Sequence, residues 1–308
     1  MPLKPPLSTI LVGTDFSPCS AAALAQALRI AAWTGAAVRV VHVIDTVVAA
    51  ELEAVLSPMQ KSIRDSLVHD AERAWTEFAA GVPGASGLAI EVVIDNRLTG
   101  ILRHARAGNA DLLIVGAYGD RAPDVGIGTV ATACVRKSPI DVLLVRDTRP
   151  GHGAGPFASV VAAVDFSNTS RAAVQRAAMF ASKDGAAFHL LHVFQPPWQR
   201  LHYRAPTPLA TPEMQKQYRD GLGRRLEEFG REAAGPFPSL RPRCEVFECP
   251  GHRSGIVDYA ASVGADLVVL GTRGRTNLRD VFLGSTAEKT LRETRCSVLA
   301  VKPRGDDA

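Results

Sequence analysis

Three glycines in the C-terminal half, together with the loop between them, have the clearest chemical potential in the sequence. Gly271 and Gly274 follow the apolar run 265–270, and after nine further residues Gly284 opens the segment Gly-Ser-Thr. The apolar run predicts a buried strand, and residues 287–295, which contain no glycine or proline, predict a helix. The free N–H groups and the positive dipole end of such a helix attract phosphate, and glycine lets a ligand approach the backbone. The stretch therefore predicts a phosphate-binding loop.

The charge of this loop favours the same interpretation, because three arginines against one aspartate leave it at +2. These charged residues are Arg273, Arg275, Arg279 and Asp280. A competing interpretation needs no ligand: Ser285 caps the helix, and Glu288 completes a capping box three residues later. Capping alone does not require three glycines and three arginines, so we favour the phosphate loop.

The elements that must position this loop are found by looking for repeats, because segments of the first half return in the second. The pairs are 9–17 with 159–167, 38–43 with 188–193, and 110–116 with 265–271. The first two pairs are offset by 150 residues and the third by 155, so a few residues are inserted in the second copy. The chain therefore consists of two tandem copies of one domain.

Each copy alternates short apolar runs with helical segments, which is typical of a parallel sheet covered by helices on both faces. The expected strands are 8–14, 37–44, 88–94, 111–116 and 140–145, then 158–164, 187–194, 243–248, 266–271 and 297–302. The expected helices are 18–34, 57–80, 98–108 and 129–137, then 168–183, 212–233, 253–263 and 285–294. We therefore predict an α/β fold of two tandem doubly wound domains, each a five-stranded parallel sheet flanked by helices. Ligands of such sheets bind beyond the carboxyl ends of the strands.

The segment between the copies is rich in glycine and proline and has no periodicity, which is typical of a linker. We expect domains at 1–147 and 157–304, joined by a linker at 148–156.

Four motifs of the second copy resemble those of the universal stress protein family. The resemblance covers nearly the whole chain, once in each copy. They are Val-Asp-Phe-Ser at 164–167, His-Val at 192–193, Ala-Asp-Leu-Val-Val-Leu-Gly at 265–271, and the glycine loop. The chain is thus similar to the tandem form of that family. The resemblance implies that the last strands, 141–145 and 297–301, meet, so that the two domains pack as a pseudo-dimer.

The resemblance also implies that the glycine loop holds the ribose and phosphates of ATP, accompanied by Mg²⁺. Asp165 would contact the nucleoside or its metal, although an aspartate there also fits a helix cap, and both roles stay open. Val193 would offer its backbone N–H and C=O to the adenine edge. The expected nucleotide-binding residues are Ala163, Val164, Asp165, Val193, Leu270, Gly271, Arg273, Gly274, Gly284, Ser285 and Thr286.

The corresponding loop of the first copy differs in length and charge. Gly116 and Gly119 are followed by only eight residues before Gly128, and one arginine against two aspartates gives the loop a charge of −1. A shorter, acidic loop is a poor site for phosphate. We therefore predict one competent nucleotide site, in the second copy.

Other residues with chemical potential have simpler interpretations. His42 and His192 lie inside apolar strands, where a hydrogen-bonded core histidine is more common than a ligand. Cys249 and His252 have a metal-like spacing near Cys244, but the local sequence offers no fourth ligand for zinc. No catalytic triad or Gly-Lys-[Ser/Thr] loop occurs, so we assign no catalytic and no metal-ligating residues.

The proline-rich segment 195–208 follows the second strand of the second copy and includes Trp198. It is either a solvated connector or a lid that closes on the base of the nucleotide.

Composition limits the class of protein. The chain has 308 residues with 46% apolar composition, a net charge of +4 and a pI near 8.9, which suits two globular domains and gives weak support for nucleic-acid binding. No apolar run has the length of a membrane helix, and the first residues do not resemble a secretory signal. Five cysteines, an odd number without a Cys-x2-Cys motif, favour a reducing compartment.

Together these features predict a cytoplasmic, ATP-binding universal stress protein that acts as a nucleotide-responsive regulator or stress-tolerance factor. Its expected partners are an adenine nucleotide and a protein that the sequence does not name, but neither membrane nor nucleic acid, and the sequence leaves open whether two copies form a homodimer. The alternatives are a slow Mg²⁺-dependent ATPase and a scaffold that binds no nucleotide.

Overall fold

The computed structural model describes residues 7–56, 62–119, 126–146, 155–200, 211–249, 252–274 and 283–303. The chain divides between Gly155 and Pro156 into two compact units. Both units have the predicted α/β architecture, while their packing as a pseudo-dimer stays a prediction.

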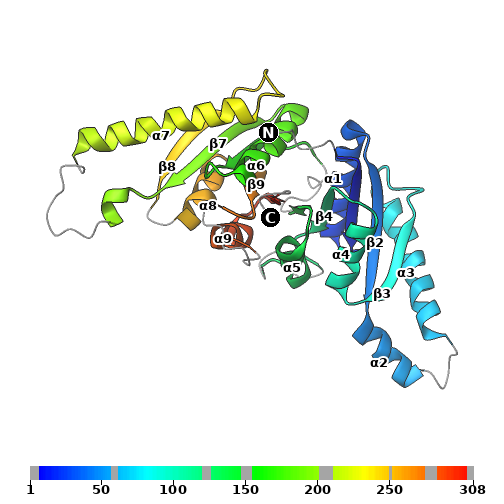
Figure 1. Cartoon of the computed structure of the whole chain (residues 1–308). Helices are drawn as coiled ribbons and strands as arrows, with labels where there is room; N and C mark the ends of the chain where they lie inside the picture. Colours follow the sequence, from blue (N-terminus) through cyan, green and yellow to red (C-terminus); the bar gives the residue numbers. More distant parts are fainter. Residues whose placement is uncertain are drawn as a thin grey trace. The chain divides into compact units, whose positions relative to one another are not determined.

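The first unit is a five-stranded parallel sheet with helices between the strands (Figure 1). Its strands are β1 (Thr9–Thr14), β2 (Ala37–Asp45), β3 (Ile90–Asp95), β4 (Leu112–Gly116) and β5 (Asp141–Val145). Its helices are α1 (Pro18–Thr34), α2 (Thr46–Leu56), α3 (Ile63–Ala80), α4 (Arg97–Ala107) and α5 (Thr129–Lys137). The strand order is β3-β2-β1-β4-β5, so β1 lies in the middle with the second and fourth strands on either side of it.

The second unit repeats this order as β8-β7-β6-β9-β10. Its strands are β6 (Ser159–Ala163), β7 (Ala187–Phe194), β8 (Arg243–Glu248), β9 (Leu267–Gly271) and β10 (Ser297–Val301). Its helices are α6 (Asn168–Asp184), η2 (Pro197–Arg200, a 3₁₀ helix), α7 (Pro212–Ala233), α8 (His252–Ser262) and α9 (Ser285–Glu293). The predicted strands of both copies are confirmed to within two residues at each end.

The sequence signals at the helix ends act as predicted. The Ser17 side chain accepts a hydrogen bond from a first-turn N–H of α1, Pro18 occupies the first helical position, and Gly35 ends the helix with a φ of 75°. Ser167 and Gly185 do the same for α6. The two halves thus share the local rules that set where each helix starts, and therefore where each strand-to-helix turn lies.

Apolar side chains on both faces of each sheet form the cores. Ile10, Leu113 and Leu144 are fully buried in the first unit, as are Phe180 and Leu190 in the second. Burying one such side chain stabilises the fold by about 1.5–3 kcal/mol. Each sheet is therefore a stable scaffold that positions the loops at its carboxyl edge. Within the described residues, no helix combines the length and apolar character that a membrane span needs.

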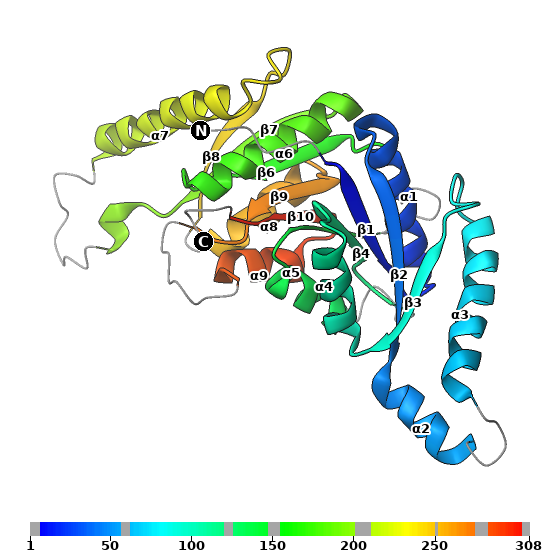
Figure 2. The same ribbon diagram turned by 45° about the vertical axis from the view of Figure 1, so that its right-hand side comes forward.

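Helix α2 differs from the sequence-based expectation, which placed a single helix at 57–80. The structure has α2 directly after β2 and starts α3 at Ile63, while residues 57–61 lie outside the described part. The Asp45 carboxylate accepts a hydrogen bond from the N–H of Val47 at 3.0 Å and so supports the first turn of α2. The helix extends beyond the end of the sheet in both views (Figure 2).

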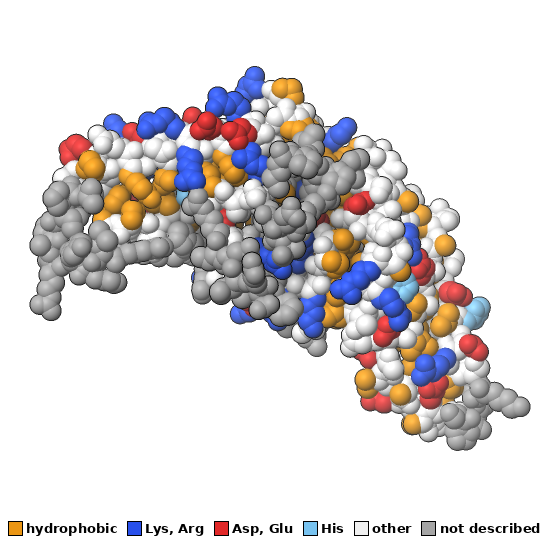
Figure 3. All heavy atoms as spheres, in the orientation of Figure 1, with side chains coloured by type: hydrophobic (Ala, Val, Ile, Leu, Met, Phe, Trp, Pro, Cys, Tyr) orange, Lys and Arg blue, Asp and Glu red, His pale blue; other side chains and the backbone are white. Residues whose placement is uncertain are grey.

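The surface of α2 is partly apolar. Val47 and Val55 are 64% and 73% exposed, and apolar side chains appear among charged ones at this end of the unit (Figure 3). The valines carry the β-branched character of a strand, which is why propensity alone gave no helix here.

The segment that follows β7 begins with η2. The Trp198 ring makes an edge contact with Tyr218 of α7, with 5.5 Å between ring centroids. Residues 201–208 of the expected lid lie outside the described part, so the lid stays a prediction.

Candidate functional site

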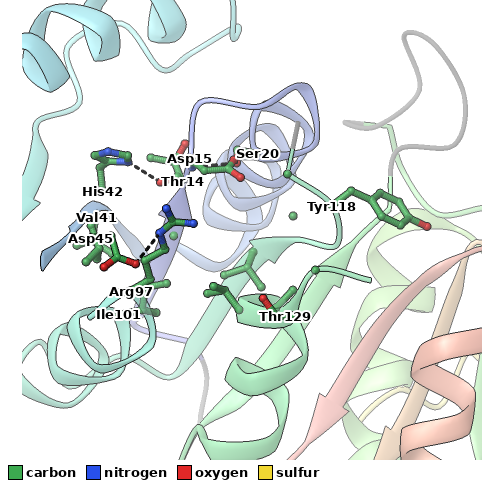
Figure 4. Close-up of a pocket in the computed structure, with 18 of the residues that line it drawn as sticks. Thr14, Asp15, Ser20, Val41, His42, Asp45, Arg97, Ile101, Tyr118 and Thr129 are labelled. Carbon is green, nitrogen blue, oxygen red and sulfur yellow. Dashed lines mark hydrogen bonds and ion pairs between the residues drawn. The ribbon is translucent and has the colours of Figure 1, made fainter. Parts of the chain in front are cut away.

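The carboxyl ends of β1, β2 and β4 enclose a cavity in the first unit. Its volume is about 600 Å³, within the range of small-molecule sites. It lies where β1 has β2 on one side and β4 on the other, which is where a doubly wound sheet binds its ligands. The polar residues that line it include Thr14, Asp15, His42, Asp45, Arg97, Tyr118 and Thr129 (Figure 4).

The positions around this cavity match the residues predicted for the second unit. By the repeat offsets, Asp15 corresponds to Asp165, and Gly116 corresponds to Gly271. Gly128, at the start of α5, likewise takes the place of Gly284. The first unit therefore has a ligand-sized cavity at the positions equivalent to the predicted binding residues. The prediction itself placed the competent nucleotide site in the second unit.

Asp165 follows β6 and stabilises the turn into α6. Its Oδ1 atom accepts hydrogen bonds from the N–H and hydroxyl of Ser167, at 3.0 and 2.5 Å. Asp15 makes the same contacts to Ser17, at 3.1 and 2.6 Å. The helix-start role of this aspartate is thus observed in both copies, while the ligand role concerns its other oxygen and stays a prediction.

The residue after each aspartate has a left-handed backbone, which is uncommon for a bulky side chain. Phe16 and Phe166 have φ angles of 63° and 64°. The centroid of each ring lies 4.5 Å from that of a histidine ring in the neighbouring strand, His42 of β2 and His192 of β7 respectively. Strained backbone of this kind persists only where the surroundings enforce it, and here it holds the aspartate at the edge of the sheet.

Both histidines are hydrogen-bonded, as the sequence predicted, and both are half-buried. Nδ1 of His42 lies 2.9 Å from the carbonyl oxygen of Thr14, and Nδ1 of His192 lies 2.7 Å from that of Val164. A carbonyl can only accept, so Nδ1 carries the proton and Nε2 is left as an acceptor in the neutral ring. Burial lowers the pKa of His42, outweighing the hydrogen bond to Thr14 and the nearby Asp15, which raise it.

His42 should make the protein sensitive to acid. Its folded-state pKa lies below the unfolded value of 6.5, so below that pH the unfolded chain takes up a proton that the folded chain does not. Stability is fully present above 6.5 and falls as the pH drops from 6.5 towards the folded pKa. In urea unfolding between about pH 7 and about pH 5, His42→Gln should therefore lose less stability than the wild type. His69 is exposed on α3, so His69→Gln should leave the pH dependence unchanged; an equal effect of both substitutions would contradict the prediction.

Two of the three glycines of the predicted phosphate loop are explained by packing. A Cβ atom on Gly271 would lie 2.8 Å from a methyl carbon of Thr169, and one on Gly274 would lie 2.7 Å from Oδ2 of Asp165. These glycines let the loop approach the turn after β6, so their presence alone does not require a ligand. Gly284 is different, because a Cβ atom there would meet only the Thr272 carbonyl oxygen, at 3.6 Å.

The start of α9 lies one residue before the serine of the alternative capping box. The N-cap is Gly284 rather than Ser285, and no side chain caps the helix. The Gly284 N–H donates to the carbonyl of Thr272 at 3.1 Å, which holds the helix start beside the end of β9. The side chain of Glu288 lies 3.5 Å from Arg292 on the helix surface. Ser285 thus does not occupy the N-cap position that the alternative capping box requires.

The remaining predicted residues occupy the same edge of the sheet. Val164 continues past β6, where its N–H donates to the carbonyl of Leu191 at 2.8 Å. Because peptide groups alternate along a strand, those of Val193 point to the same side as those of Leu191. Val164 and Leu270 are buried, whereas Arg273 is half-buried. Ala163, Thr286 and the exposed Ser285 complete the set, and Arg275, Arg279 and Asp280 of the loop lie outside the described residues.

Sequence reasoning missed an ion pair in the cavity of the first unit. Nε of Arg97 lies 3.3 Å from a carboxylate oxygen of Asp45. Asp45 is the last residue of β2 and Arg97 the first of α4. The signal for Asp45 was available, because an aspartate ends an apolar strand there, but nothing in the sequence pairs it with Arg97.

Cys249 of the suspected metal motif has a different neighbour. Its sulfur lies 3.3 Å from the hydroxyl of Ser254. Among the described residues, no group of three or more histidine, cysteine or acidic side chains is arranged to hold a metal ion.

Comparison with known proteins gives a family match in each half. The model of the Universal stress protein family matches residues 6–146 and 156–302. Universal stress protein E of Salmonella typhi is 27% identical over 272 residues, which cover 82% of this chain and 81% of the relative.

Two solved structures resemble the whole chain. One is a universal stress protein from Archaeoglobus fulgidus, with a TM-score of 0.63, 18% identity, and coverage of 96% of this chain and 98% of that one. The other is the functionally unknown protein PA1789 of Pseudomonas aeruginosa, with the same TM-score and identity and coverage of 96% and 93%. At this identity the structural likeness concerns the fold.

Proposed function

Because the chain belongs to the universal stress protein family, with one family domain in each half, we propose that its second half binds an adenine nucleotide. The protein would then act as a nucleotide-responsive regulator or stress-tolerance factor. The nucleotide would be ATP with Mg²⁺, and the location the cytoplasm, where free cysteines are the rule.

The observation that carries the proposal is the open start of α9. Gly284 begins this helix without a side-chain cap, next to the end of β9. Uncapped N–H groups and the helix dipole stabilise an anion at such a place. Arg273, half-buried two residues after β9, adds a positive charge on the same edge. The residues present therefore fit a polyphosphate.

The other end of the ligand fits the turn after β6. One oxygen of Asp165 is held by Ser167, which fixes the direction of the second oxygen. A carboxylate accepts hydrogen bonds from ribose hydroxyls. The peptide groups of Val193 point past the end of β6, towards the place that an adenine edge would take. ATP supplies the phosphates, and the chain supplies orientation and charge.

Arg273→Gln tests the charge part of the proposal. We expect it to weaken ATP binding about tenfold or more, because a hydrogen bond to a charged group contributes about 1.5–3 kcal/mol and each 1.4 kcal/mol is tenfold. The matched control is Tyr118→Phe, at the equivalent position of the first half, which should leave the affinity for ATP unchanged. Isothermal titration of both variants decides between them.

Titration of the wild type with ATP, together with an assay of inorganic phosphate release, separates the proposal from its alternatives. If ATP binds and phosphate is released over hours, the protein is a slow ATPase. Absence of ATP binding by the wild type would overturn the proposal and favour a scaffold that works through protein partners alone.

A further inference from the structure

We propose that the cavity of the first half binds an uncharged, hydroxyl-bearing small molecule of nucleoside size, such as adenosine, and rejects its phosphorylated forms. This inference rests on the proposed function, because it takes the second half as the nucleotide site. The second half would then bind the phosphorylated form of one class of ligand, and the first half the unphosphorylated form.

The size and position of the cavity suit a nucleoside. Its volume of about 600 Å³ has room for a nucleoside, and sites of this size hold most of a small ligand's surface. It lies at the carboxyl ends of β1, β2 and β4, at the positions equivalent to those that we propose for base and ribose in the second half.

The second step is the charge of the lining. Among the described residues that line the cavity, Asp15, Asp45 and Arg97 are charged, and their charges add up to −1. Arg97 is paired with Asp45 at 3.3 Å, and its guanidinium is therefore already directed at a carboxylate (Figure 4). The negative charges of a polyphosphate would be repelled by the carboxylates of the cavity. Neutral hydroxyl groups donate hydrogen bonds to carboxylates without such repulsion.

The third step is the comparison of the two halves position by position. Asp45 corresponds to the neutral Gln195, and Tyr118 corresponds to Arg273. Tyr118 is 7% exposed and its hydroxyl accepts a hydrogen bond from Arg146 at 2.6 Å, so its ring points away from Asp45 and Arg97 (Figure 4). The first half has thus exchanged a cation for a buried aromatic ring and a neutral side chain for an acid.

The remaining polar groups suit a neutral ligand. Burial keeps His42 uncharged by lowering its pKa. The start of α5 has no side-chain cap, and its first-turn N–H groups can donate to a hydroxyl or ring nitrogen as well as to an anion. The cavity lining therefore includes the carboxylates of Asp15 and Asp45 as acceptors and the backbone donors at the start of α5, and a nucleoside can use both kinds of group.

The test uses the full chain with Gly284→Val, which removes the second-half site. Isothermal titration should show one adenosine per chain, with ATP at least about tenfold weaker. Asp45→Asn in this background keeps an oxygen for the N–H of Val47 but brings the lining to neutral, so ATP binding should tighten by about fivefold. Adenosine binding should change by less than about threefold, because its ligand groups carry no charge.

A second variant shows where adenosine sits. Val48 lines the cavity and is 42% exposed, so Val48→Trp can narrow the mouth without disturbing the core, and it should weaken adenosine. Equal affinities for ATP and adenosine, no adenosine binding, or adenosine binding unchanged by Val48→Trp would each overturn the inference. The nucleotide proposal fails separately, if wild-type ATP binding is absent or survives Gly284→Val.

Discussion

Gly284→Val is expected to weaken ATP binding about a hundredfold or more, because the valine side chain occupies the space in front of the first turn of α9. Blocking two charge-assisted contacts of about 1.5–3 kcal/mol each removes that much affinity. Strain of the turn plays no part, since Gly284 has a φ of −61° and a ψ of 142°, which any residue adopts. A Cβ atom there has an ordinary contact of 3.6 Å.

Gly128→Val is the matched control in the first half. Gly128 has nearly the same backbone, with a φ of −60° and a ψ of 145°, and its Cβ atom would lie 3.5 Å from the Ala117 carbonyl oxygen. We expect this variant to fold equally well and to keep the wild-type affinity for ATP. Circular dichroism confirms folding and isothermal titration measures binding. Equal losses from the two substitutions would mean that the first half binds ATP as well.

Gly116→Ala should destabilise the protein by about 1–3 kcal/mol, and by more than the equivalent Gly271→Ala. A Cβ atom on Gly116 would lie 2.9 Å from the carbonyl carbon of Cys19 in the backbone of α1, which cannot move without shifting the helix. A Cβ atom on Gly271 would lie 2.8 Å from the methyl carbon of Thr169, which rotation can move, and its contacts with Cβ of Thr169 at 3.2 Å and the Arg273 carbonyl oxygen at 3.3 Å are less close. Neither glycine has the left-handed backbone that would add strain.

Urea unfolding of both variants, followed by circular dichroism, measures this difference. If Gly271→Ala proved the more damaging of the two, then Thr169 would be held as rigidly as backbone. If neither substitution lowered the midpoint, the close approach of strand and helix would not be limiting.

The architecture could be predicted from the sequence because the same alternation of strands and helices occurs in both halves of the chain. The repeated strands, the serine caps at Ser17 and Ser167 and the stop glycines at Gly35 and Gly185 are local signals. The strands are thereby fixed to within two residues in both halves, and with them the edge of the sheet where the site lies.

What the sequence could not predict depends on contacts between distant residues. Helix α2 is rich in β-branched and apolar residues, and its first turn is supported by Asp45, which reads as the end of a strand. The pairing of Asp45 with Arg97 joins two elements more than fifty residues apart. Likewise, Thr169 and Asp165 leave no room for a side chain at Gly271 and Gly274, so these glycines have a packing role, and their contact with a ligand stays a prediction.

The central claim is that one adenine-nucleotide site exists per chain and lies in the second half. Its most direct test is the stoichiometry of ATP binding to the wild-type chain in the presence of Mg²⁺, measured by isothermal titration. We predict one ATP per chain; two ATP per chain, or none, would contradict the claim.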